Sequence, residues 1–475
     1  MVRLAVYSVP GCPLSSLSWD NDSFRIGFLI NKIDMKKHWQ HVAGIDIGAR
    51  HIFVGIEEGE VRSFETFTEE LYRARDYLLS CGITMVAMEA TGVYWIILYE
   101  ILEAAGLEVW LVDGRQTKQV PGRKTDVKDC QWIQQLHSHG LLNRCFVPDD
   151  QVKQIRAYQR LREDHIRSAT MHINHMQKAL TQMNLRLKEV LSQVHGRSGL
   201  AMIKAILDGE RHPDQLLALC HSSIRKQKAR EVRKALHGHY TEAGLFALRQ
   251  AYEGYQFYQQ QIAACDEQIQ QAMEQANDYH KNEEQRKKIN ATGKRKPIRH
   301  NKPDVKNLGG HLLQIFGGKD ATDLPGITDY SWLQLYAEVG NDLSKWKTER
   351  HFTSWLGLAP GQHMSGKMRK NKNKKYRPKA GQIFRTIAQS LIESKKIALG
   401  AFGRRLKSKR GPSIAIKATA RKLAILYWRL MNKGLEYTEQ GIKAYEEKMK
   451  ENKQKWFKKT AHELGYQIIE YQLDT

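Results

Sequence analysis

The sequence predicts an α/β domain, then a long helical region, then a mainly helical C-terminal domain. Three observations lead to this fold class. Apolar runs of strand length alternate with helical periodicity over residues 41–148. Apolar residues then step by three and four over residues 149–278. Helical periodicity resumes over residues 308–435, after a charged interval. A chain of 475 residues is long enough to give several such domains their own cores.

The first domain, residues 41–148, contains five strand-like runs: Val42–Gly48, Ile52–Ile56, Val61–Phe67, Thr84–Glu89 and Leu107–Val112. A helix is predicted between the last two, from about Val93 to Ala105. An antiparallel meander followed by β-α-β units is typical of the ribonuclease-H type of α/β fold. Functional residues in such sheets lie at the ends of strands.

Two rows of apolar residues mark the helical region, residues 149–278. The first row comprises Ile166, Ala169, Ile173, Met176, Leu180, Met183, Leu187, Val190 and Val194. The second row comprises Leu248, Ala251, Tyr255, Tyr258, Ile262, Cys265, Ile269, Ala272 and Ala276. Two seams of similar length predict an antiparallel coiled-coil pair or an oligomerisation arm. A helical bundle that packs within one chain fits the same pattern.

The remaining segments differ in composition. Residues 1–40 are predicted to be an extension, and we expect Met35 to be the natural start, with a disordered or upstream-translated stretch before it. Residues 279–307 are rich in charge and read as a basic linker. Residues 308–435 form the predicted C-terminal domain, and residues 436–475 a charged helical tail.

The net charge favours a polyanionic partner. Lysine and arginine number 75 and aspartate and glutamate 51, so the formal charge is 75 − 51 = +24. No run of about 18 uncharged apolar residues is present, which argues against a membrane partner. The six cysteines lack paired spacing, as is usual in a reducing compartment. We therefore expect a cytoplasmic protein that faces nucleic acid.

Four acidic residues predict a metal site. Asp46 lies within an apolar strand, where a carboxylate is costly unless it binds a cation or pairs with a base. Glu89 ends another strand, and Asp126 and Asp129 begin a predicted helix on a shared face. Four such carboxylates can hold two Mg²⁺ ions about 3.5–4 Å apart for phosphoryl transfer. Helix capping by Asp126 and Asp129, or a structural role for Glu89, fits each residue taken alone.

The segments around these residues resemble a known family. "AGIDIGARHIFVGI", "MEATGVYW" and "GRKTDVKDCQWIQQLHSHGLL" are similar to the RuvC-like domain of DEDD transposases of the insertion sequence 110 family. "LPGITDYSWLQLYAEVGNDLSKWKTERHFTSWLGLAPGQHMSGKMRKNKNKKYRPKAGQIFRTIAQ" resembles the C-terminal transposase domain of the same family, and "KATARKLAILYW" its closing helix. The resemblance implies that Asp46, Glu89, Asp126 and Asp129 are the catalytic, Mg²⁺-binding quartet.

The resemblance also implies a nucleophile, Ser365, that joins covalently to DNA. Its loop suits the task, because Gly366 allows a phosphodiester to approach closely. The expected nucleic-acid-binding residues of the loop are Lys367, Arg369, Lys370, Lys372, Lys374, Lys375, Arg377 and Lys379. A serine hydroxyl needs activation. Activation by the metal site is the main hypothesis, and help from His363, on the same face of an extended loop, is a second one.

Further expectations rest on the resemblance alone. It implies a prokaryotic, nucleoid-associated recombinase that cuts and rejoins donor and target double-stranded DNA. A structured non-coding RNA, the bridge RNA, would guide it by base pairing. The enzyme would act as a tetramer in which the acidic site of one subunit meets the serine of another. The paired helical seams are a physical basis for such assembly.

Two alternatives stay open. A metal-dependent RuvC-like endonuclease would use water as the nucleophile and leave Ser365 incidental. A non-catalytic nucleic-acid-binding derivative of a mobile element would need neither the quartet nor the serine. The sequence gives neither the target sites nor the guide sequence.

Two smaller motifs have plainer explanations. Leu324–Thr328 resembles a helix-hairpin-helix turn that binds phosphate through backbone amides, although a helix-capping turn fits equally well. Four further residues could suggest zinc: Cys130, His137, His139 and Cys145. Their spacing matches no standard zinc pattern and overlaps an amphipathic helix, so a zinc site is not expected.

Overall fold

The computed structural model describes residues 37–57, 61–117, 126–279, 296–298, 300–360, 363–365, 368–370, 378–434 and 441–466. The chain divides into two compact units, residues 1–147 and 148–475. The predicted start at Met35 lies outside the described residues. Within the described part of the chain, no helix is both long and apolar enough to cross a membrane.

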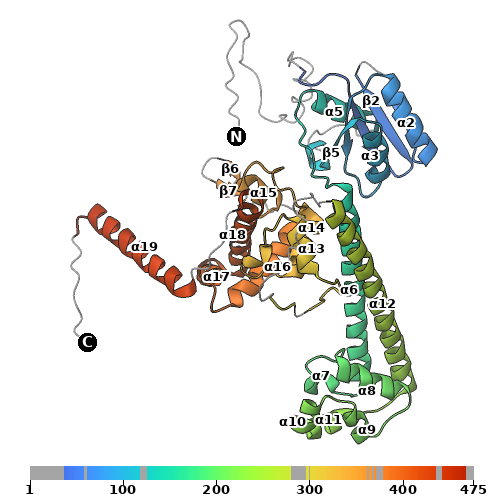
Figure 1. The fold of residues 1–475 in the computed structure, drawn as a ribbon, viewed down its shortest axis with the longest axis vertical. Helices are drawn as coiled ribbons and strands as arrows, with labels where there is room; N and C mark the ends of the chain where they lie inside the picture. Colours follow the sequence, from blue (N-terminus) through green and yellow to red (C-terminus); the bar gives the residue numbers. More distant parts are fainter. Residues whose placement is uncertain are drawn as a thin grey trace, which may run out of the picture. The chain divides into compact units, whose positions relative to one another are not determined.

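The first unit is built on one five-stranded sheet (Figure 1). Its strands are β1 (Val42–Ile47), β2 (His51–Ile56), β3 (Arg62–Glu65), β4 (Met85–Glu89) and β5 (Glu108–Val112). Their order across the sheet is β3-β2-β1-β4-β5. The first three strands pair antiparallel, whereas β4 is parallel to β1 and β5 is parallel to β4. This mixed sheet confirms the predicted ribonuclease-H-like α/β fold.

Helices cover both faces of this sheet. On one face α2 (Thr68–Ser80) and α3 (Trp95–Ala104) enclose an apolar core with the side chains of alternate strand residues, such as Ile45 and Met88. On the other face α5 (Asp126–Ser138) packs against β1 and β2, and its Ile133 shares a smaller core with Ala87 and Val112. The predicted strands and the helix near Val93–Ala105 agree with these bounds to within two residues.

The second unit contains two long helices, α6 (Asp150–Gln182) and α12 (Glu242–Tyr279), which lie side by side (Figure 1). They are antiparallel, because His172 of α6 contacts Gly254 whereas the earlier residue Arg162 pairs with the later residue Asp266. The predicted antiparallel helix pair is confirmed, and its two helices pack on each other within one chain. A role of this pair as an oligomerisation arm stays a prediction.

The first apolar row predicted one continuous helix, and this prediction is wrong beyond Met183. α6 ends at Gln182, and Asn184 adopts a left-handed backbone with a φ of 54°. The chain turns there, because a helix cannot pass through that conformation. Leu187 and Val190 belong to a separate short helix and are buried in a core that also includes residues of α6 and α12.

That core forms a helical cluster at one end of the pair (Figure 1). Its helices are α7 (Leu187–Val190), α8 (Arg197–Leu207), α9 (Pro213–Ala218), α10 (Ser222–Gln227) and α11 (Ala229–Leu236). The cluster turns the chain around between the two long helices.

The C-terminal region is mainly helical, as predicted. Its elements are α13 (Leu308–Ile315), η2 (Ala321–Asp323), α14 (Asp329–Val339), α15 (Glu349–Trp355), α16 (Lys379–Glu393), α17 (Ala398–Arg410), α18 (Pro412–Lys433) and α19 (Gly441–Glu463). α18 packs against α15, α16 and α17, and it buries its apolar face there. A small hairpin, β6 (His363–Ser365) and β7 (Met368–Lys370), precedes α16.

The described part of the predicted linker packs on its neighbours. The Lys296 amine donates hydrogen bonds to the carbonyl oxygens of Thr322 and Leu324. The backbone N–H of Asp304 donates to Oδ2 of Asp266 on α12, at 3.1 Å. Residues 280–295, which include Arg286, Lys287 and Lys288, lie outside the described residues.

Candidate active site

Asp46 and Glu89 lie side by side at the ends of two parallel strands. β1 and β4 pair in a register that places Ile45 opposite Met88. Asp46 and Glu89 are the next residues along each strand, so both carboxylates stand at the same edge of the sheet. Both residues are half-buried, while the residues before them are buried. The predicted position of an acidic pair at strand ends agrees with this register.

Strand alternation places these two side chains on the face covered by α5. Gly44, two residues before Asp46, faces the backbone of α5. Ala87, two residues before Glu89, packs with Ile133 of α5. Because residues two apart on a strand point to the same face, Asp46 and Glu89 project toward this helix as well.

Glycine lets α5 lie directly on the sheet. A Cβ atom at Gly44 would stand 2.3 Å from the carbonyl oxygen of Cys130, and one at Gly55 would stand 3.1 Å from the backbone nitrogen of Gln131. Distances this short leave no room for any larger residue at Gly44. The first turn of α5 contains Asp126 and Asp129, and Asp129 is half-buried. The side chain of Asp126 lies outside the described residues.

The carboxylates of Asp46 and Asp129 both affect the pKa of Cys130. Burial, together with the smaller effect of the neighbouring carboxylates of Asp46 and Asp129, raises the pKa of the Cys130 thiol to about 12. Two residues far apart in sequence therefore lie within electrostatic reach of one thiol. The resulting negative potential favours a bound cation.

Glu89 is positioned by residues that follow β5. Thr117 Oγ1 donates a hydrogen bond to Glu89 Oε2 at 2.7 Å. A Cβ atom at Gly114 would stand 2.3 Å from Glu89 Oε1, so the carboxylate lies directly over this glycine. Both belong to α4 (Gly114–Thr117). Neither residue was predicted from the sequence, although a glycine two positions after a predicted strand indicates a close backbone approach.

The donor set fits a hard divalent cation. Carboxylate oxygens are the ligands that Mg²⁺ prefers, and Asp46 and Glu89 present them from adjacent strand ends. Within the described residues, however, no three His, Cys, Asp or Glu side chains are arranged as a metal-binding group. The Mg²⁺ assignment is therefore a proposal based on donor chemistry and register.

Ser365 is the last residue of β6 and pairs with Met368 of β7. The backbone from His363 to Ser365 is extended, which is the condition assumed for a role of His363. The side chains of His363 and Ser365 lie outside the described residues. So do those of seven predicted nucleic-acid-binding residues: Lys367, Arg369, Lys370, Lys372, Lys374, Lys375 and Arg377.

Lys379, the eighth predicted nucleic-acid-binding residue, is described. It begins α16, and its Nζ lies 3.3 Å from Oε2 of Glu163 on α6. Both side chains are partly exposed, so this ion pair contributes little free energy and leaves the lysine accessible to a phosphate.

The possible zinc residues are part of the core. Cys130 and His137 are buried, and the His137 ring packs on Trp110 with 5.1 Å between ring centroids. Burial lowers the pKa of His137 to about 4 and raises that of Cys145 to about 11. Among the described side chains, these residues form no metal-binding group.

Leu324–Thr328 acts as a helix-capping turn. Thr328 and Ser331 form a reciprocal capping box at the start of α14. Gly326, with a φ of 77°, packs beneath Ile387 and Leu391 of α16. Helix capping therefore explains the Leu324–Thr328 segment without a role in phosphate binding.

Comparison with known families matches both parts of the chain. A DEDD-type IS110 family model, described as Transposase, matches residues 43–185, which include the acidic quartet. A second model, described as Transposase IS116/IS110/IS902 family, matches residues 319–402, which include Ser365. Comparison with curated proteins found no match. Two models of one family match in order along the chain, and they join a ribonuclease-H-like sheet to a helical C-terminal region. The chain belongs to the IS110 family of transposases, enzymes that cleave and transfer DNA.

Proposed function

We propose that this transposase cuts and rejoins donor and target DNA with Ser365 as nucleophile and with Mg²⁺ held by Asp46, Glu89, Asp126 and Asp129. One observation carries the metal half of the proposal. Asp46 and Glu89 adjoin at the ends of parallel strands, on the face covered by the helix that begins with the other two carboxylates.

In the proposed reaction the Ser365 hydroxyl attacks a backbone phosphorus. A bond forms between the serine oxygen and phosphorus, and the bond from phosphorus to one strand end breaks. The released end leaves as a hydroxyl, which takes up the proton that the serine gives up. Attack by the hydroxyl of a new partner strand then frees the serine and rejoins the DNA. Energy of the broken bond is kept in the serine–DNA linkage, so the rejoining needs no other energy source.

The chain's residues divide the remaining work. When bound, Mg²⁺ supplies positive charge that offsets the charge of the reacting phosphate. Asp46, Glu89, Asp126 and Asp129 hold it, and Thr117 fixes the orientation of the Glu89 carboxylate by its hydrogen bond. The basic residues from Lys367 to Lys379 bind backbone phosphates on both sides of the scissile bond.

The covalent step is tested by substitution of the serine. We expect Ser365→Ala to abolish both strand cleavage and the covalent protein–DNA adduct that denaturing gels detect. Ser354→Ala, at an exposed serine of the same region, is the matched control and should behave as wild type. If Ser365→Ala still cut DNA with Mg²⁺, the water-using endonuclease would be the better description.

The metal site is tested separately. Asp46→Asn and Glu89→Gln should abolish cleavage, because the amides lack the charge that binds Mg²⁺. DNA binding should persist, because each new side chain has the size of the one it replaces and leaves the fold unchanged. Recombination that survives Asp126→Ala with Asp129→Ala would point to a different metal site or to a non-catalytic role.

We also propose guidance by a bridge RNA and assembly as a tetramer. Support comes from the family and from the net charge of +24, which suits several nucleic-acid strands at once. Recombination should require RNA transcribed from the non-coding end of the element, and a changed guide loop should redirect it to the newly paired DNA. Equal recombination without RNA would contradict only the proposed guidance by RNA. The proposed role of Ser365 as nucleophile would not be affected.

A further inference from the structure

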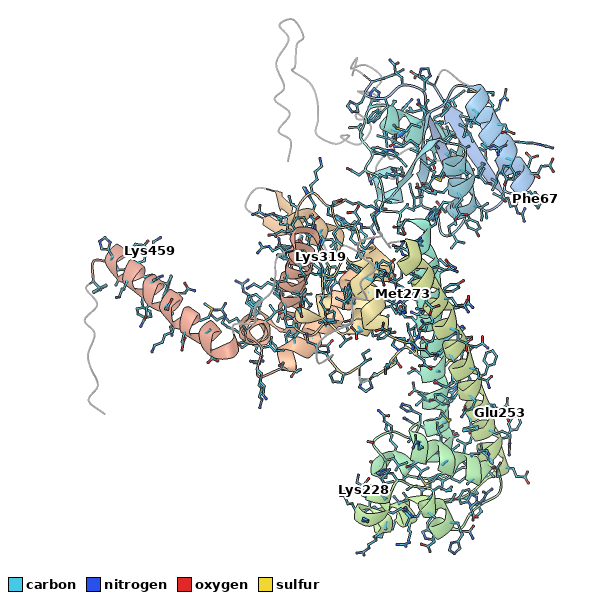
Figure 2. The ribbon with its side chains drawn as sticks, in the orientation of Figure 1. Phe67, Lys228, Glu253, Met273, Lys319 and Lys459 are labelled. Atoms are coloured by element: carbon cyan, nitrogen blue, oxygen red, sulfur yellow. The ribbon has the colours of Figure 1, made fainter. Side chains whose placement is uncertain are left out.

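The helix α19 lies beyond both regions that match the transposase family, since the second match ends at residue 402. None of its described side chains is buried. Trp456 is 60% exposed and Phe457 is 54% exposed, and their ring centroids are 5.6 Å apart. Figure 2, in which Lys459 is labelled, shows the side chains of this helix standing out on all sides. The proposed recombination chemistry uses none of them.

A helix of this kind needs a partner. Within the second unit, α19 contacts α17 near Met449, which receives a contact from Arg405. Beyond that point its described residues make few packing contacts, and a helix without tertiary packing is only marginally stable in water. Two adjacent exposed aromatic rings are also unfavourable in water. These features are typical of a surface that becomes covered when a ligand binds.

The charges around the two rings identify the kind of ligand. Residues 450–459 contain five lysines and one glutamate, so the segment carries 5 − 1 = +4 charges. Lysines and aromatic residues are interleaved in it rather than separated. Because residues three or four apart are neighbours on a helix, Lys453 lies beside both rings and Lys459 beside Trp456.

This interleaving argues against a membrane. A helix that lies on a bilayer keeps its apolar face free of charge, with lysines on the opposite face. Here Lys453 is on the same face as Trp456 and Phe457. Positive charge next to exposed ring faces instead matches single-stranded nucleic acid, which presents phosphates and stackable bases together.

We propose that α19 is an additional nucleic-acid-binding element that takes a strand with unpaired bases. Its lysines would bind the backbone phosphates, and Trp456 and Phe457 would stack on bases that are not already stacked in a duplex. Such a strand could be single-stranded DNA or the loop of an RNA, because both offer the same chemistry. The proposal does not depend on the identity of the nucleophile.

The test compares three fluorescein-labelled probes on the full-length protein: dT20, rU20 and a 20-base-pair DNA duplex. Trp456→Ala with Phe457→Ala should weaken the binding of dT20 and rU20 by about tenfold and leave the duplex nearly unchanged. Lys453→Gln with Lys459→Gln should reduce the slope of log affinity against log salt by about 1.4 for the single strands. If the affinity for dT20 falls more than that for rU20 when the rings are removed, the ligand is DNA; the reverse result identifies RNA.

A matched control is available on α12. Phe257 is 53% exposed and its ring lies 5.2 Å from that of Tyr258, so it resembles Phe457 in exposure and in ring contact. No lysine or arginine lies within four residues of it. Phe457→Ala should weaken dT20 binding, whereas Phe257→Ala should leave it unchanged. Equal effects of the two substitutions would overturn the proposal.

Hydrogen exchange gives a local readout that other binding surfaces cannot mimic. Amides of residues 446–466 should exchange more slowly when dT20 or rU20 is added, and this protection should persist in Ser365→Ala. Protection by phosphatidylserine vesicles but not by the single strands would overturn the proposal in favour of a membrane. Protection that rises with protein concentration alone would overturn it in favour of a second copy of the chain.

Discussion

At the scale of single residues, the arrangement of the candidate site depends on two glycines, which have no side chain. Gly44 admits the backbone of α5, and Gly114 admits the carboxylate of Glu89. These contacts bring Asp46, Glu89 and the first turn of α5 to one edge of the sheet. The acidic residues supply the chemistry, and the glycines supply their arrangement.

Thr117 offers a direct test of how Glu89 is oriented. Thr117→Val removes the hydrogen bond to Glu89 Oε2 but keeps the shape of the side chain. We expect the Mg²⁺ concentration needed for half-maximal cleavage to rise about tenfold, as for other residues that orient a metal ligand. Thr117→Ser restores the hydroxyl and should restore the wild-type requirement. An unchanged requirement in Thr117→Val would show that this hydrogen bond does not matter for metal binding.

His137 predicts a loss of stability in acid. Burial lowers its pKa to about 4, whereas the unfolded chain binds a proton near pH 6.5. The unfolded state therefore binds more protons between these values, so the stability that depends on the neutral ring is complete above about pH 6.5 and is lost as the pH falls toward 4. His137→Leu should reduce this loss, measured by thermal unfolding from pH 7 to pH 4. His139→Leu, two residues along, is the control, and an equal effect there would contradict the assignment.

At the scale of elements, α6 and α12 are joined to the C-terminal helices by a buried ion pair. Arg162 Nε lies 2.6 Å from Asp266 Oδ1, and the two side chains are 1% and 6% exposed. Arg162 Nη1 also donates to the hydroxyl of Tyr330 on α14, at 3.1 Å. One guanidinium thus connects three helices that are far apart in sequence.

Breaking this pair from one side should be costly. Asp266→Asn leaves a buried guanidinium without its counter-charge, and we expect the free energy of unfolding to fall by about 3–5 kcal/mol. The double substitution Arg162→Met with Asp266→Leu removes both charges and should cost much less. Asp150→Asn breaks the exposed pair with Lys153 and should cost about 1 kcal/mol or less. Denaturant unfolding followed by circular dichroism measures all three, and similar losses in the single and double variants would refute the argument.

The elements also show what a sequence pattern can and cannot predict. Strand bounds were predicted closely because buried strands are continuous apolar runs between turn residues. The end of α6 was missed because Leu187, Val190 and Val194 keep the helical spacing after the helix has ended. The turn depends on the left-handed backbone of Asn184, which is a tertiary choice. Likewise, the quartet was predicted from strand ends, but Thr117 was missed because its contact with Glu89 joins residues 28 positions apart.

At the scale of the whole molecule, the residues of the proposed reaction belong to two compact units of the chain. The acidic quartet belongs to residues 1–147, and Ser365 belongs to residues 148–475. The proposed reaction uses both the quartet and the serine. The family resemblance places them on different subunits of a tetramer, and this arrangement stays a prediction.

Mixing two inactive variants tests that arrangement. Ser365→Ala keeps the acidic quartet intact, and Asp46→Asn keeps the serine intact, so neither protein should cleave DNA alone. If each active site combines the quartet of one subunit with the serine of another, random mixing in equal amounts gives about one quarter of the sites both intact parts. The mixture, refolded or co-expressed so that subunits exchange, should then form covalent adducts only on the Asp46→Asn chains, which a size tag distinguishes on a denaturing gel. If both parts came from the same subunit, every site in the mixture would lack one of them, and the mixture would stay inactive.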